Sequence, residues 1–426
     1  MHKESRMNRK TVVALTLLSF NLSYAHAQSV DELFTGSSLD LQLRAFWFDG
    51  RRDLKINRTS LTVGGIVGVQ SGAYEGFSAK TALYSSNALS SLNHMSDSAA
   101  TQNLQANGDN INTLGEGYLQ YSAYNSSIRL GRQRLDFPLI NDYYNRMLPN
   151  SFEALNIENH TLDTLIFKAA YVTKWKYKTD NTFESPTDIS GIKRDIAIIG
   201  ALYTPNSDLK LEFYDTYIQD VMHAPYLQFN NKNIWNFSNG SVFSGGIQYL
   251  NEKSIGQNAA GKANTYLLGL KGALSNEEWS LSALYTRIGS QALLGTGSHY
   301  EMMGWSSFLT YTDLQIDGES ENAGAIAYAT ILSYAPNPSF TISTKYAYIH
   351  QDDSLQSNPL SLTNNPRPDS NEYNIDAIYK IEKNFQLRTR LAYLDYLKES
   401  TSLYKNRAFD ETNVRLIIDY SLNFSK

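Results

Sequence analysis

Six basic side chains, three toward each end of the sequence, could act together on an anionic solute. They are Arg44, Arg58, Lys80, Arg388, Arg390 and Arg415. A guanidinium binds a carboxylate through two parallel hydrogen bonds, and a row of like charges concentrates counter-ions in a water-filled channel. Lys80 and Arg388 are more than 300 residues apart. Only a fold that places the two ends of the chain side by side could unite the set.

The same segments carry acidic residues, which give the six cations a second interpretation. The carboxylates concerned are Asp40, Glu372, Asp376 and Asp419. Ion pairs with them would make the basic set a structural network instead of a track for anions. The sequence leaves both interpretations open, and we predict that the six basic residues form a functional track for anions.

The link at 135–151 is a second candidate, because it combines charges with a stiff backbone. Asp142, Tyr144 and Arg146 could select solutes by charge at a constriction, and Pro138 and Pro149 each lock a backbone dihedral. Its apolar residues need burial, and a barrel interior is the nearest place for them: Leu135, Phe137, Leu139, Ile140, Met147 and Leu148. The alternative is a loop that caps the outside and packs on neighbouring loops.

No constellation in the sequence supports catalysis or metal binding. Cysteine is absent, which excludes disulfides and the common zinc sites. Five histidines lie beyond residue 27 without the spacing of a metal site or of a Ser/His/Asp triad: His94, His160, His223, His299 and His350. We therefore expect a protein that is not an enzyme, with no catalytic residue, no metal and no cofactor.

Alternation with period two identifies the elements that must position these groups. Between 39 and 47 the odd-numbered residues are apolar and Arg44 lies on the other face, and between 414 and 424 Arg415 alternates with apolar neighbours. No apolar run approaches the roughly 20 residues of a membrane helix. A charge facing lipid would cost about 2–4 kcal/mol at mid-membrane, so the charged faces must line a lumen. The sequence predicts an all-β fold, a transmembrane antiparallel β-barrel of about 18 strands.

The expected strands run from 38–48 to 412–424, and the links between them alternate in length. Even-numbered links are short, and the odd-numbered links are mostly long: 86–112, 135–151, 174–193, 289–322, 351–370 and 397–411. Outer-membrane barrels alternate short periplasmic turns with long external loops in this way. The weakest strands are 224–231, which is short, and 323–334, which is apolar on both faces. Closure of the barrel would bring the six basic residues onto one wall.

The first 27 residues have the features of a secretory signal peptide. Arg9 and Lys10 precede an apolar stretch at 11–22, and a small-x-small cleavage site ends at Ala27. Removal of this segment leaves one β-barrel domain, 28–426. The net charge then changes from −5 to −8, because the segment carries four basic residues and one acidic residue. No basic surface results, so nucleic acid is not an expected partner.

One segment is more specific than the alternation, and it is similar to a known family. Its motif residues are Leu130-Gly131-Arg132-Gln133, Pro138-Leu139, Asn141-Asp142, Arg146-Met147-Leu148-Pro149 and Phe152-Glu153-Ala154. They resemble the OprD-type porin family, in which a Gly-Arg-Gln-like strand end leads into an Arg-Leu-Pro…Phe-Glu-Gly pattern. Ala154 replaces the glycine. Eighteen strands, a mature length near 400 and the long link at 289–322 also resemble that family.

The resemblance implies a passive outer-membrane channel, a monomer or a loose homotrimer, with the third and seventh external loops folded inward. It also implies a ladder of lumen-facing basic residues that guides carboxylate-bearing nutrients such as amino acids or organic acids. Expected partners are small-molecule solutes, outer-membrane lipid and lipopolysaccharide, and the barrel insertion machinery. An aromatic residue near the end of the last strand, Phe424, resembles the signal that this machinery reads. The alternatives are a sugar-type porin, which would need an aromatic slide in the lumen, and an outer-membrane barrel hydrolase or adhesin.

Overall fold

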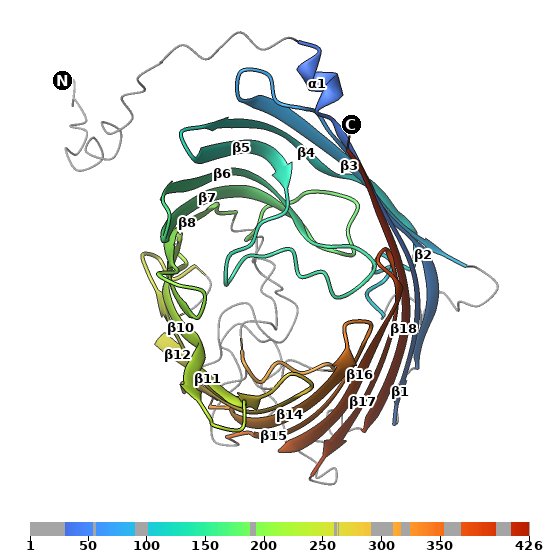
Figure 1. Cartoon of the computed structure of the whole chain (residues 1–426), viewed down its shortest axis with the longest axis vertical. Helices are drawn as coiled ribbons and strands as arrows, with labels where there is room; N and C mark the ends of the chain where they lie inside the picture. The colour runs from blue at the N-terminus through green and yellow to red at the C-terminus, as the bar shows by residue number, and fades with distance from the viewer. Residues whose placement is uncertain are drawn as a thin grey trace.

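The computed structural model describes residues 30–53, 57–89, 101–187, 193–259, 262, 264–290, 310–316, 324–352, 368–397 and 410–425. The signal segment predicted at 1–27 lies outside them. Eighteen antiparallel strands form one closed sheet, as the alternation predicts (Figure 1). No helix within the described ranges is long and apolar enough to cross a membrane.

The strands follow one another around the ring in chain order, each paired with its neighbours in sequence. They are β1 (Ser38–Arg52), β2 (Arg58–Gln70), β3 (Phe77–Ala88), β4 (Ile111–Ala123), β5 (Ser126–Gln133), β6 (Ser151–Leu162), β7 (Leu165–Lys176), β8 (Ile196–Tyr203), β9 (Leu209–Ile218), β10 (Met222–Asn236), β11 (Val242–Ser254), β12 (Asn264–Ser275), β13 (Trp279–Ile288), β14 (Ile326–Asn337), β15 (Phe340–His350), β16 (Ser370–Glu382), β17 (Phe385–Tyr396) and β18 (Glu411–Ser425). One short helix, α1 (Glu32–Thr35), precedes them.

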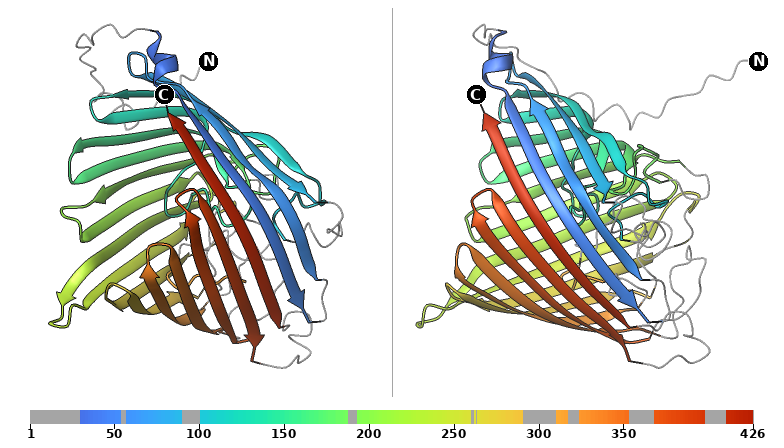
Figure 2. Two further views of the ribbon diagram at one scale, coloured as in Figure 1. Left: turned by 45° about the vertical axis from the view of Figure 1, so that its right-hand side comes forward. Right: turned by 90° about the vertical axis from the view of Figure 1, so that its right-hand side faces the viewer.

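The ring closes at a seam between the first and last strands. β1 and β18 pair over fifteen register positions, from Ser38 opposite Ser425 to Arg52 opposite Glu411. β1 also pairs with β2, so neither side of it is left open. The strands are steeply tilted, and the short turns, α1 and the end of β18 lie at one end of the barrel, the turn end (Figure 2). The strand ends that the longer connections join lie at the opposite end, the loop end.

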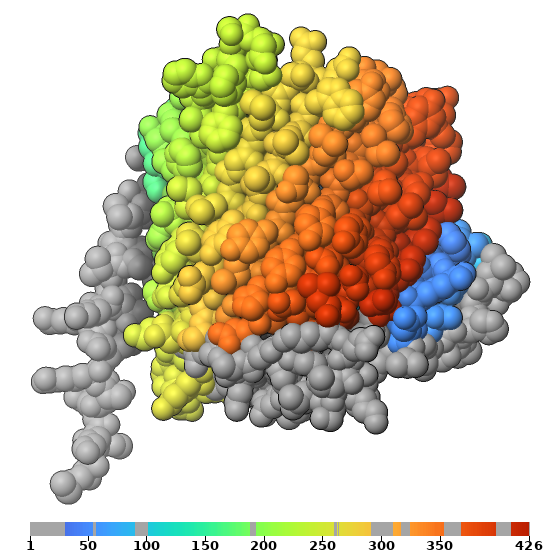
Figure 3. Space-filling model, turned by 90° about the horizontal axis from the view of Figure 1, so that it is seen from below, coloured from blue at the N-terminus to red at the C-terminus, as the bar shows by residue number. Residues whose placement is uncertain are grey.

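The two faces of the wall follow the alternation in the sequence. Leu43 is 47% exposed on the outside of β1, whereas Phe46 and Phe48 are fully buried on the inside. On β18, Leu416 and Ile418 are likewise exposed outward. Side chains of β10 to β18 form a continuous outer surface along one side of the molecule (Figure 3). Apolar residues therefore cover the outside, and the inner face combines charged and polar residues with buried apolar side chains.

Several strand boundaries differ from the expectation by a few residues, and the two strands least clear in the sequence are among them. The strand expected at 224–231 runs from Met222 to Asn236, because its turn-end half continues to pair with β11 and carries Trp235 outward, 63% exposed. The strand expected at 323–334 is β14, Ile326–Asn337. Its apolar residues on both faces are explained by the interior, since Ala327 and Ala329 are buried in an inner cluster. Because apolar residues also pack inside the lumen here, β14 lacks the polar inner face that alternation would otherwise show.

Candidate functional site

Loop L3, residues 134–150 between β5 and β6, lies inside the ring of strands (Figure 1). All six apolar residues expected to need burial are buried: Leu135, Phe137, Leu139, Ile140, Met147 and Leu148. The predicted burial of this segment in the barrel interior is confirmed. Burial of each such side chain contributes about 1.5–3 kcal/mol, so the loop is held firmly in this position.

L3 contacts two separate parts of the inner wall. Its first half packs in a cluster with inner residues of β6 to β13, where the rings of Phe137 and Tyr214 meet edge to face at 5.7 Å. Its second half, with Met147 and Leu148, packs in another cluster with Phe46, Phe48 and neighbours on β1 to β4 and β18. The loop therefore bridges the lumen between the two clusters.

The three L3 residues singled out in the sequence have different surroundings. The Asp142 carboxylate accepts a hydrogen bond from Arg134 Nε at 2.7 Å, and both side chains are about one-third exposed. The Tyr144 ring lies between the guanidinium groups of Arg44 and Arg134, with its centroid 4.2 and 5.5 Å from their carbons. Arg146 is buried, and its Nε donates to the carbonyl of Thr101 at 3.2 Å.

Burial changes the protonation chemistry of two of these L3 groups. It raises the pKa of the Tyr144 phenol, which therefore remains a neutral ring between two cations. Burial alone would lower the pKa of Arg134, but the adjacent Asp142 carboxylate outweighs it, so the pKa is raised. Arg134 therefore keeps its positive charge beside the Asp142 carboxylate, and L3 presents this mixed pair to the lumen.

All six residues of the predicted basic wall lie on the inner face, and five of them have a carboxylate partner. Arg44 binds Asp419 at 2.5 Å, and Lys80 lies 3.5 Å from Glu116. Arg58 binds Glu411, which also binds Arg52. Arg388 and Arg390 share a single carboxylate, that of Asp376, at 2.8 and 3.2 Å respectively.

Arg415 has no carboxylate partner among the residues that the structure describes. It is 1% exposed, and its guanidinium donates to Asn413 Oδ1 at 3.1 Å and to the Gln315 carbonyl at 2.7 Å. Its Nη1 is buried without a hydrogen-bond partner. Arg390 is its register partner on β17. Among the described residues, the three arginines Arg388, Arg390 and Arg415 therefore have one carboxylate partner between them, that of Asp376.

The Phe48 ring contacts two arginines of the basic wall and one of L3, and sequence reasoning did not find it. The guanidinium carbons of Arg58, Arg146 and Arg415 lie 5.6, 5.6 and 5.4 Å from its centroid. Such contacts stabilise a buried cation through the ring quadrupole. The signal that could have found Phe48 is its position: it shares the inward parity of Arg44 on the same strand.

The seventh loop also contacts the inner wall through its described residues, 310–316. The backbone N–H groups of Gln315 and Ile316 donate to the two carboxylate oxygens of Glu372 at 2.6 and 3.2 Å. The Tyr311 hydroxyl donates to Asn230 on β10, and burial raises its pKa to about 12. Glu372 therefore anchors this loop, and the described residues include no ion pair between it and the basic wall.

A polar pocket of about 240 Å³ lies between L3, the seventh loop and the opposite wall. Its lining includes the phenols of Tyr214, Tyr226 and Tyr311 and the side-chain amides of Gln228 and Gln248. Lys210 and Glu212, which also line it, form an ion pair of 3.1 Å. Lys168 lies at its edge and donates to the Asp136 carbonyl of L3 at 2.9 Å. Hydroxyl and amide groups dominate this side of the lumen.

The described ranges hold no cluster of three or more potential metal ligands. His160, His223 and His350 each lie beside one carboxylate, at 3.6, 2.8 and 3.1 Å. His94 and His299 fall outside the described residues. The contacts of the described histidines are isolated imidazole–carboxylate contacts spread around the barrel.

Comparison with known proteins identifies the family and the fold. The family described as outer membrane porin, OprD family, matches residues 31–424. Pseudomonas aeruginosa OccK9 (OpdG) superposes with a TM-score of 0.75 at 19% identity, over 91% of this chain and 98% of that one. Acinetobacter baumannii OccAB1 gives 0.76 at 15%, over 93% and 99%, and P. aeruginosa OccD3 (OpdP) gives 0.74 at 18%, over 93% and 94%. No curated protein sequence matches.

Proposed function

Because the chain belongs to the OprD family of outer-membrane porins, we propose that its pore prefers small polar solutes that bear a carboxylate, such as amino acids or organic acids. Diffusion through the lumen is passive and needs no cofactor. One chain encloses one complete lumen, so a monomer and a loose homotrimer would conduct by the same route.

The observation that carries this proposal is a local cluster of three arginines on β17 and β18 with one carboxylate partner between them in the described part of the chain. Two arginines share Asp376, and Arg415 has no carboxylate partner among the described residues. Low-dielectric walls around a water-filled lumen focus the field of such a cluster and raise the local concentration of anions. The net charge of the whole chain is −5, but exposed loop charges are screened within about 8–10 Å at physiological salt.

Different residues of the basic wall contact the solute and contribute to the electric field in the lumen. The Arg388 and Arg390 side chains are 34% and 19% exposed, so a solute carboxylate can reach them. Arg415 is buried beneath the seventh loop and contributes charge without contact. A carboxylate would exchange with Asp376 for hydrogen bonds to either of these partly exposed guanidinium groups, which leaves passage reversible.

We assign L3 to the narrowest part of the route. Asp142 and Arg134, each about one-third exposed, would meet the solute as a mixed pair of charges. The Tyr144 ring contacts Arg44 of the basic wall, and Arg44 Nη1 also donates to the Arg146 carbonyl, so the loop is held against that wall. A constriction of this composition admits a carboxylate while disfavouring a solute with charge of one sign along its whole length.

The test is reconstitution in a planar bilayer with a salt gradient. We expect a reversal potential of the sign given by anion preference. Arg390→Gln should shift it toward zero, because this substitution removes a partly exposed cation of the wall. The matched control is Lys271→Gln, which removes one inward-facing charge from β12, on a different part of the ring.

Equal shifts in the two variants would mean that only total charge matters, and the wall assignment would fall. Cation preference in the unaltered protein would show that the acidic partners dominate the lumen.

A channel for neutral sugars is the second candidate, and the phenol- and amide-lined pocket favours it. Tyrosine and glutamine side chains offer donors and acceptors suited to hydroxyl groups. The same bilayers distinguish the two functions through block of the ionic current. A neutral hexose that blocks at lower concentration than a carboxylate of similar size would favour the sugar channel.

A further inference from the structure

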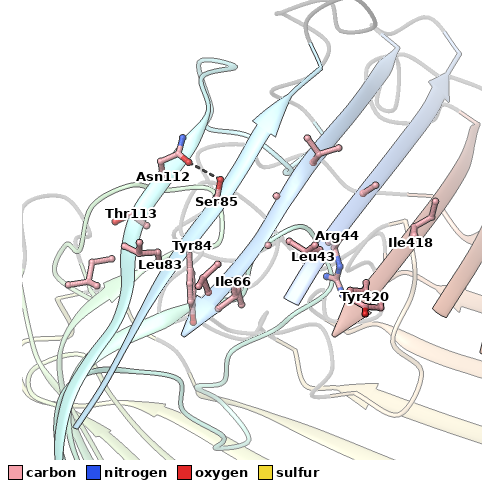
Figure 4. Close-up of a pocket in the computed structure, with 16 residues that line it drawn as sticks. Leu43, Arg44, Ile66, Leu83, Tyr84, Ser85, Asn112, Thr113, Ile418 and Tyr420 are labelled. Atoms are coloured by element: carbon pink, nitrogen blue, oxygen red, sulfur yellow. Dashed lines mark hydrogen bonds between the residues drawn. The ribbon is translucent and has the colours of Figure 1, made fainter. Parts of the chain in front are cut away.

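A furrow crosses the outer face of the barrel on five neighbouring strands, β18, β1, β2, β3 and β4 (Figure 4). Its axis is one row of register partners. They are Tyr420, Leu43, Gly65, Ser85 and Asn112, each opposite the next across a strand pair. The centre of the row is low because Gly65 has no side chain and Ser85 has a small one.

Larger apolar side chains border this row. On the turn-end side, Val67, Leu83 and Leu114 are partners on β2, β3 and β4, and Leu83 is 60% exposed. On the loop-end side, Ala45 lies opposite both Ile418 and Val63. The furrow encloses about 860 Å³, within the roughly 300–1,000 Å³ of typical ligand pockets.

The length of the furrow suits one hydrocarbon chain. Neighbouring strands lie about 4.8 Å apart, so four steps from β18 to β4 span roughly 19 Å. One leaflet of a bilayer core is about 15 Å thick, half of a core of about 30 Å. Because the strands are tilted by about 35–45°, a row at right angles to them runs obliquely through the leaflet. An extended acyl chain therefore fits along it.

The two ends of the furrow differ in chemistry and in height. Asn112 is the second residue of β4 from the loop end, whereas Tyr420 is the tenth of β18. At the Asn112 end, Ser85 Oγ donates to Asn112 Oδ1 at 2.8 Å and Asn112 Nδ2 donates to Asn87 Oδ1 at 3.1 Å. The polar end thus faces the external leaflet, whose lipid is lipopolysaccharide.

We propose that this furrow binds one acyl chain of a lipopolysaccharide molecule, with the polar linkage of the chain at Asn112 and its methyl end toward Tyr420. The occupant is a membrane lipid because the outward side chains along the furrow belong to the surface that contacts acyl chains in the bilayer. The site is separate from the lumen, so it is independent of solute preference.

Native mass spectrometry of the whole protein in mild detergent tests this site with two probes, deep-rough lipopolysaccharide and phosphatidylethanolamine. We expect a one-to-one lipopolysaccharide adduct, and at least a tenfold lower adduct fraction for Ala45→Phe, which fills the furrow. Ala283→Phe, at an exposed outward position on β13, is the matched control and should keep the adduct. Ser85→Leu fills the same row from β3 and replaces Ala45→Phe if that variant does not fold.

Equal adducts in the filled and control variants would overturn the site. Stronger binding of phosphatidylethanolamine than of lipopolysaccharide would overturn the choice of leaflet. A dimer that is lost on filling the furrow, with no lipid adduct in the unaltered protein, would show that a second copy covers this face instead.

Discussion

Deletion of residues 138–148 should raise single-channel conductance about twofold or more and should weaken preference among solutes. L3 bridges two inner clusters, one on β6 to β13 and one on β1 to β4 and β18, so its removal widens the path between them. The strands and their register do not depend on these residues, since β5 and β6 pair directly with each other. Planar-bilayer recording with a series of carboxylates provides the measurement.

The control for this deletion is Asp142→Asn, which removes one charge and leaves the loop backbone in place. It should change solute preference with little change in conductance. Folding of each variant is checked by resistance to detergent and by altered migration before heating. Unchanged conductance in a folded deletion variant would mean that L3 is not the narrowest part of the route, and the barrel and basic wall would still stand.

Gly65→Ala should lower the free energy of unfolding by about 3 kcal/mol or more, through backbone strain and lost strand pairing. Gly65 has a φ of 142°, a region that L-residues rarely adopt, and a Cβ there would lie 1.8 Å from the backbone oxygen of Gln42 on β1. A flexible side chain could give way, but this neighbour is backbone. The β1–β2 pairing must therefore shift.

Gly68→Ala on the same strand is the matched control. Its Cβ would approach Ala82 Cβ at 3.4 Å, an ordinary contact, so stability should change little. Urea titration of protein refolded into lipid vesicles measures both variants. Equal stability of the two would refute the claim that close approach of the β1 backbone requires glycine at 65.

Strand placement could be predicted from the sequence because the membrane environment enforces the alternation. A charge such as Arg44 between Leu43 and Ala45 has one acceptable face, and this fixes the orientation of the whole of β1. The burial of Phe137 and Ile140 could also be predicted, since a loop with so many apolar residues needs an apolar partner. Position in a strand and composition of a loop are local properties.

The partners of the basic residues could not be predicted, because they depend on where loops come to rest. Arg146 contacts Thr101 from another loop, and Arg415 contacts Gln315 from a third. The inward-facing Phe46 and Phe48 do carry information about these loops. Apolar side chains on the lumen face indicate that something fills that side of the lumen, and the filler is L3.

The outer furrow was also beyond local reading of the sequence. Its row combines one residue from each of five strands, and a shift of one strand by one residue would break it. Gly65 and Ser85 lie far apart in the sequence, and only the strand register places them side by side. Features built across strands need the closed sheet to be seen.

The seam between β1 and β18 imposes an order on biogenesis. Because β1 pairs with β18, from Ser38 opposite Ser425 onward, the barrel cannot close until β18 has been synthesised and has reached the membrane. Until then β1 has an open edge that could pair with other chains, and the nascent polypeptide must be kept from doing so on its way across the periplasm. A nonsense mutation ahead of β18 would leave two open edges and would remove all fifteen closing pairs. Truncated alleles should thus behave as nulls and be cleared by proteolysis.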